Sequence, residues 1–326
     1  MSKLVTIFGG SGFIGRYIAR RLARKGWRVR VACRRPETAG FVRTYGVVGQ
    51  VEPIFCNIRD DDSVRGALHS ADAVVNCVGT FDAKGKNNFD AIQHEGAARI
   101  ARLAKEQSVA RMVHISAIGA DAESESGYAR TKAEGEAAVL EHMPDAVILR
   151  PSVVFGPEDA FFNRFAKMTR ISPFLPLFGA ETRFQPVYVD DVAAAAVMGA
   201  TGRAAPGVYE LGGPEAASFR DLMKQMLSVI MRRRLVIGFP FWVGAIAGWM
   251  SDLMTSATLG VISGPVTGDQ IKQLKADNVV SEDAHGFEAL GISPTSMDAI
   301  LPEYLWAYRP SGQYAAIKDS ARDLRT

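Results

Sequence analysis

The chain has 326 residues, which is enough for one large domain or for a domain with a smaller lobe. Hydrophobic residues make up 48% of it and charged residues 22%, which is the composition of an ordinary globular protein. The net charge of +3 is too small to indicate a protein that binds nucleic acid.

The first predicted element is a strand that leads directly into a glycine-rich turn and a helix. A short apolar run from about residue 3 is followed by Gly9, Gly12 and Gly15, and a helical pattern begins at once. Gly9 permits the tight turn, Gly12 lets backbone N–H groups approach a pyrophosphate, and Gly15 lets the helix pack close to the strand. The helix N-terminus offers free N–H donors to the phosphates. This context predicts dinucleotide binding, and the alternative is a glycine-rich turn without a ligand.

The charge is concentrated at the N-terminus, where residues 1–36 include ten basic residues and no acidic one. Arg16, Arg20 and Arg24 are spaced four residues apart and therefore share one face of the first predicted helix. Such a face is most simply a solvated surface. The alternative is a face that docks onto an anionic surface or an acidic partner.

Strands and helices alternate through residue 116, and the strands are continuous apolar runs. This pattern predicts an α/β fold with a Rossmann-type doubly wound parallel sheet, covered by helices on both faces. The connections between strands are expected to be right-handed. The expected helices are residues 13–25, 38–45, 62–68 and 88–106, and strands are expected from about residue 3 and at 28–33, 51–56, 73–78 and 111–116.

The second half of the chain is expected to complete this domain and to add a smaller C-terminal lobe. We place an NADP(H)-binding Rossmann domain at residues 1–215, with some elements of the lobe inserted after about residue 157. Residues 216–326 form the C-terminal lobe, which would dock to a membrane surface or to partner subunits. The expected helices are residues 127–142, 161–170, 190–200 and 219–231, the expected strands are 146–149, 185–189 and 208–211, and 173–176 is an expected loop.

The residues after the second strand indicate which nicotinamide cofactor binds. An acidic residue there would bond the ribose 2′-hydroxyl of NAD, whereas an arginine accommodates the 2′-phosphate of NADP. This chain has Arg34 and Arg35 and no acidic residue before Glu37. Because a guanidinium can pair with a phosphate through two hydrogen bonds, we expect NADPH in preference to NADH. The alternative is a pair of solvent-facing arginines on a loop.

Tyr128 and Lys132 lie four residues apart at the start of a predicted helix, and therefore on one face of it. A lysine beside a tyrosine lowers the pKa of the phenol and can also bind a ribose hydroxyl. The phenol can then move a proton to or from a carbonyl oxygen while hydride moves to or from the nicotinamide. By itself this spacing is common by chance and mostly structural.

Together these motifs resemble the short-chain dehydrogenase/reductase superfamily, in its extended or atypical branch, over about residues 3–215. The resemblance implies Tyr128 and Lys132 as the acid/base pair, with Ser116 as a vestigial third group. The family's usual hydroxyl follows the fifth strand at positions where this chain has Ala117 and Ile118, so the group that orients a substrate carbonyl is missing. The resemblance implies these cofactor-binding residues: Gly9, Ser11, Gly12, Phe13, Ile14, Gly15, Arg34, Arg35, Asn57, Ile58, Val78, Gly79, Ser116, Tyr128, Lys132, Pro151 and Val153.

A basic and aromatic stretch marks the C-terminal third of the chain. Residues 232–234 are arginines, and the apolar run 235–250 is broken by Pro240 and three glycines. A membrane-spanning helix needs about twenty apolar residues, so none is expected here. Residues 239–254 suit a helix that lies in a membrane interface, on a partner, or on the protein's own lobe. The expected apolar stripe consists of Trp242, Ile246, Trp249, Met250 and Leu253.

The order of motifs also resembles one atypical branch in particular, the alpha-9-type nucleotide-binding accessory subunit of respiratory complex I (NADH:ubiquinone oxidoreductase). The shared stretches are residues 114–119, 155–163, 185–191 and 277–279. The resemblance implies a tightly held structural NADPH and other complex I subunits as partners, near the junction of the peripheral and membrane arms. It implies a peripheral position on the cytoplasmic face of a bacterial inner membrane, or on the matrix side if mitochondrial, with residues 232–262 at the membrane surface.

Three functions remain open on this basis. The first is an accessory subunit that holds NADPH and turns over no substrate. The second is an NADP-dependent reductase or epimerase that uses Tyr128 as its acid/base. The third is an NADP(H) redox sensor that changes partner with the state of its cofactor. The sequence indicates no particular substrate.

Three cysteines lie at or near the ends of predicted strands. Three thiols cannot all pair with one another, and their spacing is not that of a metal site, so no metal is predicted. We expect Cys33, Cys56 and Cys77 to be reduced core thiols in a reducing compartment. No signal or transit segment precedes the first strand, so we expect either a bacterial protein of the cytoplasmic side or a mature form without its leader.

Overall fold

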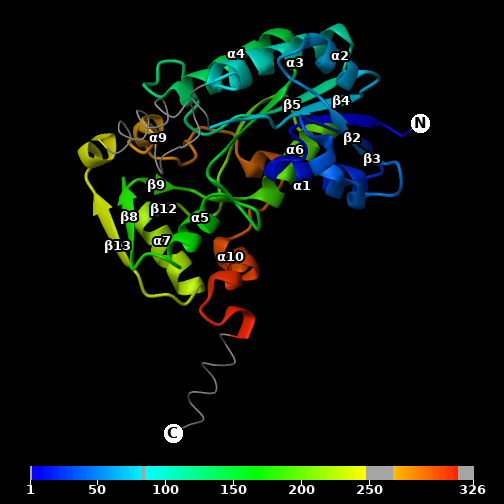
Figure 1. Cartoon of the computed structure of the whole chain (residues 1–326). Coiled ribbons are helices and arrows are strands. Elements are labelled where there is room, and N and C mark those ends of the chain that lie inside the picture. The colour runs from blue at the N-terminus through cyan, green and yellow to red at the C-terminus, as the bar shows by residue number, and fades with distance from the viewer. Residues whose placement is uncertain (1, 82–84, 247–266, 315–326) are drawn as a thin grey trace. The chain divides into compact units, whose positions relative to one another are not determined.

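The computed structural model describes residues 2–81, 85–246 and 267–314, and these residues form two compact units (Figure 1). The chain passes between the two units several times, so each unit consists of three separate segments. Residues 153–188 belong to the second unit, and residues 280–293 return to the first. The first unit comprises Met1–Ser152, Val189–Gly212 and Val280–Ser293, and the second comprises Val153–Tyr188, Gly213–Val279 and Pro294–Thr326.

A seven-stranded parallel sheet forms the centre of the first unit, in the order β11-β6-β5-β4-β1-β2-β3. The order reverses between β1 and β4, because the chain adds β2 and β3 on one side of β1 and then crosses to the other side. Helices α2, α3 and α4 lie on one face of the sheet, and α1 and α6 lie on the other (Figure 1). The expected doubly wound Rossmann-type sheet is therefore confirmed.

The elements of this unit follow the apolar runs of the sequence. Strands β1 and β4 are buried along their whole length, because helices cover both faces of the sheet. The bounds are β1 Leu4–Phe8, α1 Phe13–Arg24, β2 Arg28–Cys33, η1 Pro36–Tyr45, β3 Val51–Phe55, α2 Asp61–Leu68, β4 Ala73–Asn76, η2 Asp90–His94, α3 Glu95–Glu106, β5 Arg111–Ile115, α4 Gly127–His142, β6 Val147–Pro151, α6 Val189–Thr201, β11 Gly207–Leu211 and η3 Phe287–Leu290.

Two expected helices of the first unit differ from the prediction. The segment expected at residues 38–45 is a 3₁₀ helix, η1, that begins at Pro36. The long helix expected at residues 88–106 begins instead with a π turn, η2. The side chain of Gln93 in this turn is buried and donates a hydrogen bond to the backbone carbonyl oxygen of Thr80. In a regular helix the Gln93 side chain would point away from Thr80. The pattern of apolar residues in the sequence does not reveal this hydrogen bond.

The second unit packs short strands and helices around an aromatic core. Phe161, Phe184 and Phe219 lie in mutual ring contact at its centre, with centroids 5.6–6.1 Å apart. The bounds are β7 Val154–Phe155, α5 Phe162–Met168, β8 Phe174–Phe178, β9 Arg183–Phe184, β10 Val187–Tyr188, β12 Ala217–Ser218, α7 Phe219–Val229, β13 Leu235–Phe239, α9 Gly268–Gln273, α10 Met297–Leu305, η4 Trp306–Tyr308 and η5 Gly312–Tyr314.

The prediction of a loop at residues 173–176 is wrong. Residues 174–178 form β8, which pairs in parallel with β13, and Pro176 lies opposite Ile237. A proline is tolerated there because each strand of a two-stranded sheet has a free edge. Residues 241–246 are helical, as expected for part of 239–254, but Phe239 is instead the last residue of β13. Residues 247–254 of that prediction lie outside the described residues.

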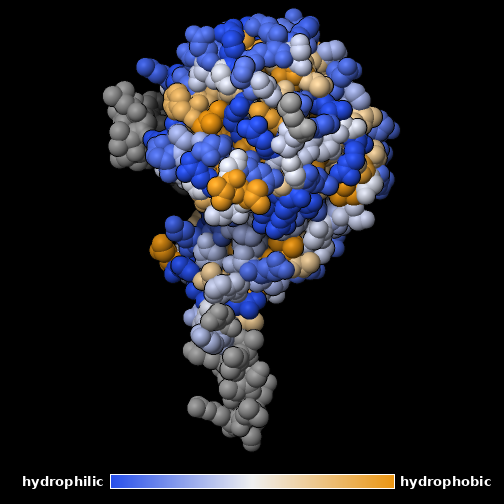
Figure 2. All heavy atoms as spheres, turned by 90° about the vertical axis from the view of Figure 1, so that its right-hand side faces the viewer, coloured by the Kyte–Doolittle hydropathy of each residue, from blue (hydrophilic) through white to orange (hydrophobic). Residues whose placement is uncertain are grey.

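Within the described part of the chain, no helix is both long enough and apolar enough to cross a membrane. Figure 2 shows one face of the molecule, on which hydrophilic side chains predominate and apolar side chains form small separate patches. Scattered apolar patches of this kind are normal for a solvated surface. This face therefore gives no indication of a docking site.

Candidate cofactor-binding site

A cleft of about 280 Å³ lies in the first unit, at the carboxyl ends of β1 to β4. These are the strands on either side of the point where the sheet order reverses, which is where doubly wound sheets bind their ligands. Eight of the residues expected to bind a cofactor line it. They are Gly9, Ser11, Gly12, Arg34, Asn57, Ile58, Val78 and Gly79.

The glycine turn at the floor of the cleft has no room for side chains. Gly9 has a φ of +74°, and an added Cβ would lie 3.1 Å from the backbone carbonyl of Cys77. An added Cβ on Gly15 would lie 2.4 Å from the carbonyl oxygen of Gly9. The helix α1 can therefore begin against the turn only because both positions lack a side chain.

The N-terminus of α1 has no side-chain cap. Gly12 is its N-cap residue, and no acidic residue lies in the first turn. By contrast, α2, α4 and α7 are capped by the side chains of Asp60, Ser126 and Ser218. The first N–H groups of α1 are thus available to an anion, and the helix dipole favours negative charge at this position.

The predicted arginines lie beside the cleft, at the end of β2. A second hollow of about 410 Å³ is lined by Ser11, Cys33, Arg34, Arg35 and Thr38, and it shares three of these residues with the cleft. Both arginines are exposed, and neither forms an ion pair with the described residues. Two guanidinium groups without a carboxylate partner are suited to a phosphate.

All three cysteines line the cleft, which the sequence did not predict. Their thiols form no disulfide. Burial raises the pKa of the Cys56 thiol to about 11 and that of Cys77 to about 12, and it also raises the pKa of Cys33. The thiols therefore stay protonated at neutral pH. Their position at the end of β2 and directly after β3 and β4 was the available signal, because the carboxyl ends of parallel strands share one edge of the sheet.

Tyr128 and Lys132 lie on the first two turns of α4, with the Lys132 ammonium 5.9 Å from the centre of the Tyr128 ring. The ring of Tyr128 stacks on Phe81 at 5.4 Å and meets Phe89 edge-on at 5.9 Å. Burial lowers the pKa of Lys132 to about 8, and the neighbouring Glu136 partly opposes this effect. The ammonium donates a hydrogen bond to the carbonyl oxygen of Ile115, which holds it at the end of β5.

A small group of buried polar side chains lies beside Lys132. His114 lies near the end of β5, and Ser116 directly follows the strand. Each of the two is almost wholly buried. His114 Nδ1 lies 3.1 Å from the side-chain amide nitrogen of Asn76, which makes Nδ1 the acceptor and Nε2 the protonated nitrogen. Neither His114 Nε2 nor the Ser116 hydroxyl has a hydrogen-bond partner within the described residues. Burial, followed by the charge of Lys132, lowers the pKa of His114 to about 3.

The comparisons with known proteins agree with this architecture. The family described as NAD dependent epimerase/dehydratase matches residues 5–212, which include the sheet and the cleft. The chain belongs to this family. The fold matches that of WbmH from Bordetella bronchiseptica, whose structure was determined in complex with NAD+, with a TM-score of 0.70 and 18% identity over 96% of this chain and 100% of that one.

Within the family, the chain is most informatively compared with two mitochondrial proteins named NADH dehydrogenase [ubiquinone] 1 alpha subcomplex subunit 9. The Arabidopsis thaliana protein is 34% identical over 316 residues, which cover 95% of this chain and 79% of that protein. The Mus musculus protein is 31% identical over 310 residues, or 94% and 80% of the two chains. The resemblance to the alpha-9 type of complex I subunit is therefore confirmed.

The remaining expected site residues do not line the cleft. Ser116 is only 4% exposed, and the family's usual hydroxyl position is occupied by Ala117 and Ile118. Pro151 ends β6, where its carbonyl oxygen accepts a hydrogen bond from the N–H of Ile118, and Val153 belongs to the second unit. Phe13, Ile14 and Gly15 lie in the first turn of α1, whose backbone rather than side chains would meet a ligand.

An ion pair that the sequence did not predict ties α4 to the sheet. Arg150 on β6 forms a bidentate pair with Glu136 on α4, with nitrogen–oxygen distances of 2.9 and 2.6 Å. Glu210 on β11 lies 3.6 Å from the same guanidinium. Glu136 is one turn beyond Lys132, so this pair fixes the helix that carries Tyr128 and Lys132.

Proposed function

We propose that this chain is an accessory subunit of a respiratory NADH:ubiquinone oxidoreductase, in which it holds NADPH as a structural cofactor and turns over no substrate. The observation that carries the proposal is the similarity to the alpha-9-type subunits along 95% of the chain. A match confined to the nucleotide-binding sheet would be equally compatible with many enzymes of the family. Here the match extends through the second unit, which is where a docking surface would lie.

The hydrogen-bond donors that line the cleft are suited to a dinucleotide. The uncapped first turn of α1 would receive the pyrophosphate, with Gly9 and Gly12 allowing close approach. Asn57 and Ile58 would lie along the adenosine half, and Val78 and Gly79 lead toward Lys132, whose ammonium is 3.8 Å from a Cβ built on Gly79. When bound, the nicotinamide would supply hydride chemistry. The chain itself supplies the phosphate donors and the ribose anchor.

The preference for NADPH over NADH rests on Arg34 and Arg35. Both are exposed beside Ser11 and Thr38, and among the residues that the structure describes no acidic side chain lines this hollow. A 2′-phosphate there would gain charge-assisted hydrogen bonds from a guanidinium, whereas a 2′-hydroxyl would gain little.

The absence of turnover is proposed because the family's usual hydroxyl, which would orient a substrate carbonyl, is missing from its position after β5. Ser116 is buried and the next two positions are Ala117 and Ile118. Loss of one preorganised donor of this kind typically costs about 3–4 kcal/mol of barrier lowering. NADPH that is not consumed can instead stabilise the native state, because a ligand that binds only the folded form adds to its stability.

The second unit offers a surface for docking. Leu235 on β13 is 71% exposed and Trp242 is 66% exposed. Arg232 and Arg234 donate to the backbone carbonyl oxygens of Tyr308 and Thr169 rather than to carboxylates, so their charges are not neutralised there. We propose that the described part of residues 232–262 rests on the anionic membrane surface beside the complex, with the protein on its cytoplasmic or matrix face.

Purification from native membranes in a mild detergent tests the proposed function. The chain should migrate with the NADH:ubiquinone oxidoreductase, and denaturation of the purified assembly should release one NADPH per chain. Incubation with carbonyl or quinone substrates should leave this NADPH unoxidised. A chain that migrates alone and contains no nucleotide would refute the proposal.

Replacing residues 232–234 by glutamine tests the docking surface separately. We expect this variant to bind anionic vesicles more weakly and to dissociate from membranes at lower salt. The matched control replaces three exposed basic residues of the first unit by glutamine, namely Arg24, Lys25 and Arg28. It removes the same amount of positive charge. Equal losses in both variants would show that net charge, and not this surface, determines membrane binding.

A second candidate function is an NADP-dependent reductase or epimerase, which the arrangement of Tyr128 and Lys132 favours. The low pKa of Lys132 and its place beside the Tyr128 ring are suited to stabilising a phenolate during proton transfer. In that case Tyr128→Phe would abolish substrate-dependent NADPH oxidation and leave NADPH binding intact. If Tyr128→Phe leaves both assembly and respiration unchanged, the enzyme function is excluded.

A further inference from the structure

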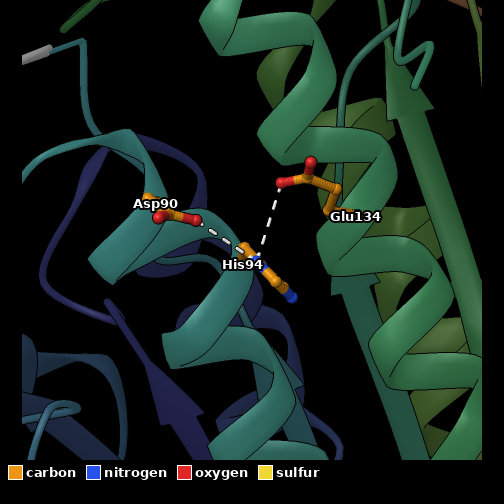
Figure 3. Close-up of side chains that lie close together, drawn as sticks. All are labelled: Asp90, His94 and Glu134. Carbon is orange, nitrogen blue, oxygen red and sulfur yellow. Dashed lines mark hydrogen bonds and ion pairs between the residues drawn. The ribbon is translucent and has the colours of Figure 1, made fainter. Parts of the chain in front are cut away.

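Three side chains outside the cofactor cleft converge on one point, as Figure 3 shows. Asp90 and His94 lie on the π turn η2, and Glu134 lies on the facing helix α4. His94 Nδ1 is 3.2 Å from an Asp90 carboxylate oxygen and 3.6 Å from a Glu134 carboxylate oxygen. Each residue offers one atom of a kind that can ligate a metal, a nitrogen or a carboxylate oxygen, and these three atoms lie within 4.8 Å of one another.

We propose that Asp90, His94 and Glu134 bind a zinc ion. In a tetrahedral zinc site with bonds of about 2.0–2.1 Å, neighbouring ligand atoms lie about 3.3 Å apart. The two distances from His94 Nδ1 bracket this value, so small side-chain rotations would complete the site. An imidazole nitrogen favours zinc over calcium or magnesium, and two carboxylates balance the charge of a divalent ion.

A hydrogen bond alone would satisfy the cluster less well. A protonated imidazole has a single Nδ1–H, which can be directed at one carboxylate but not at both. The second carboxylate would then keep only a screened electrostatic attraction. A metal ion on the side of Nδ1 contacts all three groups at once, and water can complete its coordination because the three residues are exposed or half-buried.

The backbone holds the two ligand-bearing elements rigidly together. An added Cβ on Gly135, the residue after Glu134, would lie only 2.2 Å from the carbonyl oxygen of Gln93, the residue before His94. The Thr131 hydroxyl lies 3.3 Å from the Gln93 side-chain oxygen, which adds a second connection between η2 and α4. The π turn itself closes with a bond from the N–H of Glu95 to the carbonyl oxygen of Asp90. Ligands on such a preorganised framework lose little freedom on binding.

The ion would act as a clamp near the cofactor cleft. Phe89, which directly precedes Asp90, contacts the ring of Tyr128, and Tyr128 lies in the first turn of the helix that carries Glu134. Zinc bound between η2 and α4 would therefore fix the two elements that position this aromatic contact. The site does not depend on the proposed function, because it requires neither NADPH nor a partner subunit.

Zinc titration of the full-length protein, stripped of metal with a chelator, tests the proposal. In competition with a chromophoric chelator, the wild-type protein should bind one zinc ion per chain, and zinc should raise its melting temperature. His94→Gln and Glu134→Gln each remove one ligand, and we expect each to weaken binding by about 100-fold or more, since outer-shell changes alone cost 10–100-fold. Cobalt in place of zinc should give the absorption of a tetrahedral site in the wild-type protein only.

Two substitutions on the same helix provide matched controls. His142→Gln and Glu141→Gln change the same residue types near the C-terminus of α4, away from the cluster, and both should bind zinc like the wild-type protein. Circular dichroism verifies that all variants are folded. Zinc binding that is absent from the wild-type protein, or that persists undiminished in His94→Gln and Glu134→Gln, would overturn the proposal. The second result would place the metal on other ligands, such as the cysteines of the cleft.

Discussion

Replacing Gly15 by alanine should destabilise the protein, although alanine is the better helix former. On helix propensity alone the substitution would gain up to about 1 kcal/mol. In this structure the new methyl group would lie 2.4 Å from the carbonyl oxygen of Gly9 and 2.7 Å from the Cα of Gly10. Both obstacles are backbone atoms, so the turn itself must move. Overpacking of this kind costs about 1–3 kcal/mol, and we expect a net loss of about 1–2 kcal/mol.

The same movement should weaken cofactor binding. The N–H groups of the turn and of the first turn of α1 would shift away from the pyrophosphate, and we expect the affinity for NADPH to fall by about tenfold or more. Urea denaturation without nucleotide measures the first effect, and calorimetric titration with NADPH measures the second. Gly66→Ala is the matched control, because Gly66 lies in α2 with nothing within 4 Å of an added Cβ.

The two substitutions should change stability in opposite directions. Gly66→Ala should stabilise the protein by up to about 1 kcal/mol and leave NADPH affinity unchanged. If Gly15→Ala is as stable as the wild-type protein and binds NADPH equally well, the close approach of helix and turn does not constrain the site. The spacing of the glycines would then not reflect a need for this close approach.

Three further predictions concern cofactor choice, a buried histidine and a buried ion pair. Arg34→Ser should weaken NADPH binding by about ten- to hundredfold and leave NADH binding unchanged, since charge-assisted hydrogen bonds contribute about 1.5–3 kcal/mol. Arg28→Ser, tested in parallel, should change the affinity for neither cofactor. Equal losses of affinity for both cofactors in Arg34→Ser would argue against a 2′-phosphate site. Because the pKa of His114 is lowered to about 3, the unfolded chain binds a proton below pH 6.5 that the folded protein does not. Stability should therefore fall with pH in this range, and the stability advantage of the wild-type protein over His114→Gln should shrink by about 2 kcal/mol between pH 7 and pH 5; an unchanged difference would show that His114 is not held neutral. Glu136→Gln should lower the free energy of unfolding by about 2–3 kcal/mol. This is less than the 3–5 kcal/mol for a fully buried pair, because the Arg150 side chain is 25% exposed. A loss below about 0.5 kcal/mol would contradict the role of the pair in fixing α4 to the sheet.

The local pattern of the sequence was sufficient where one physical rule dominates. The strand expected at residues 28–33 and the helix expected at 127–142 match β2 and α4 in both bounds. The apolar runs, the glycine turn and the serine that caps α4 are all local features. The same pattern failed at residues 173–176, where pairing with the distant β13 turns an expected loop into a strand.

Side-chain environments could not be predicted in the same way. Cys56 is buried in the core as expected, whereas Cys33 and Cys77 are only half-buried. All three also meet along a cleft, because parallel strands bring their carboxyl ends to one edge. The burial of Ser116 and the pairing of Arg150 with Glu136 likewise depend on which helix covers which part of the sheet.

The sequence by itself determined the class of fold, the position of the glycine-rich turn and the family, because these depend on periodicity and on glycines at fixed spacing. Only the tertiary structure decided which polar groups are brought together across elements. The convergence of Asp90 and His94 with Glu134 depends on a π turn and on the close approach of Gly135 to a neighbouring backbone. Such convergence arises from packing between segments about 40 residues apart, and no local spacing in the chain encodes it.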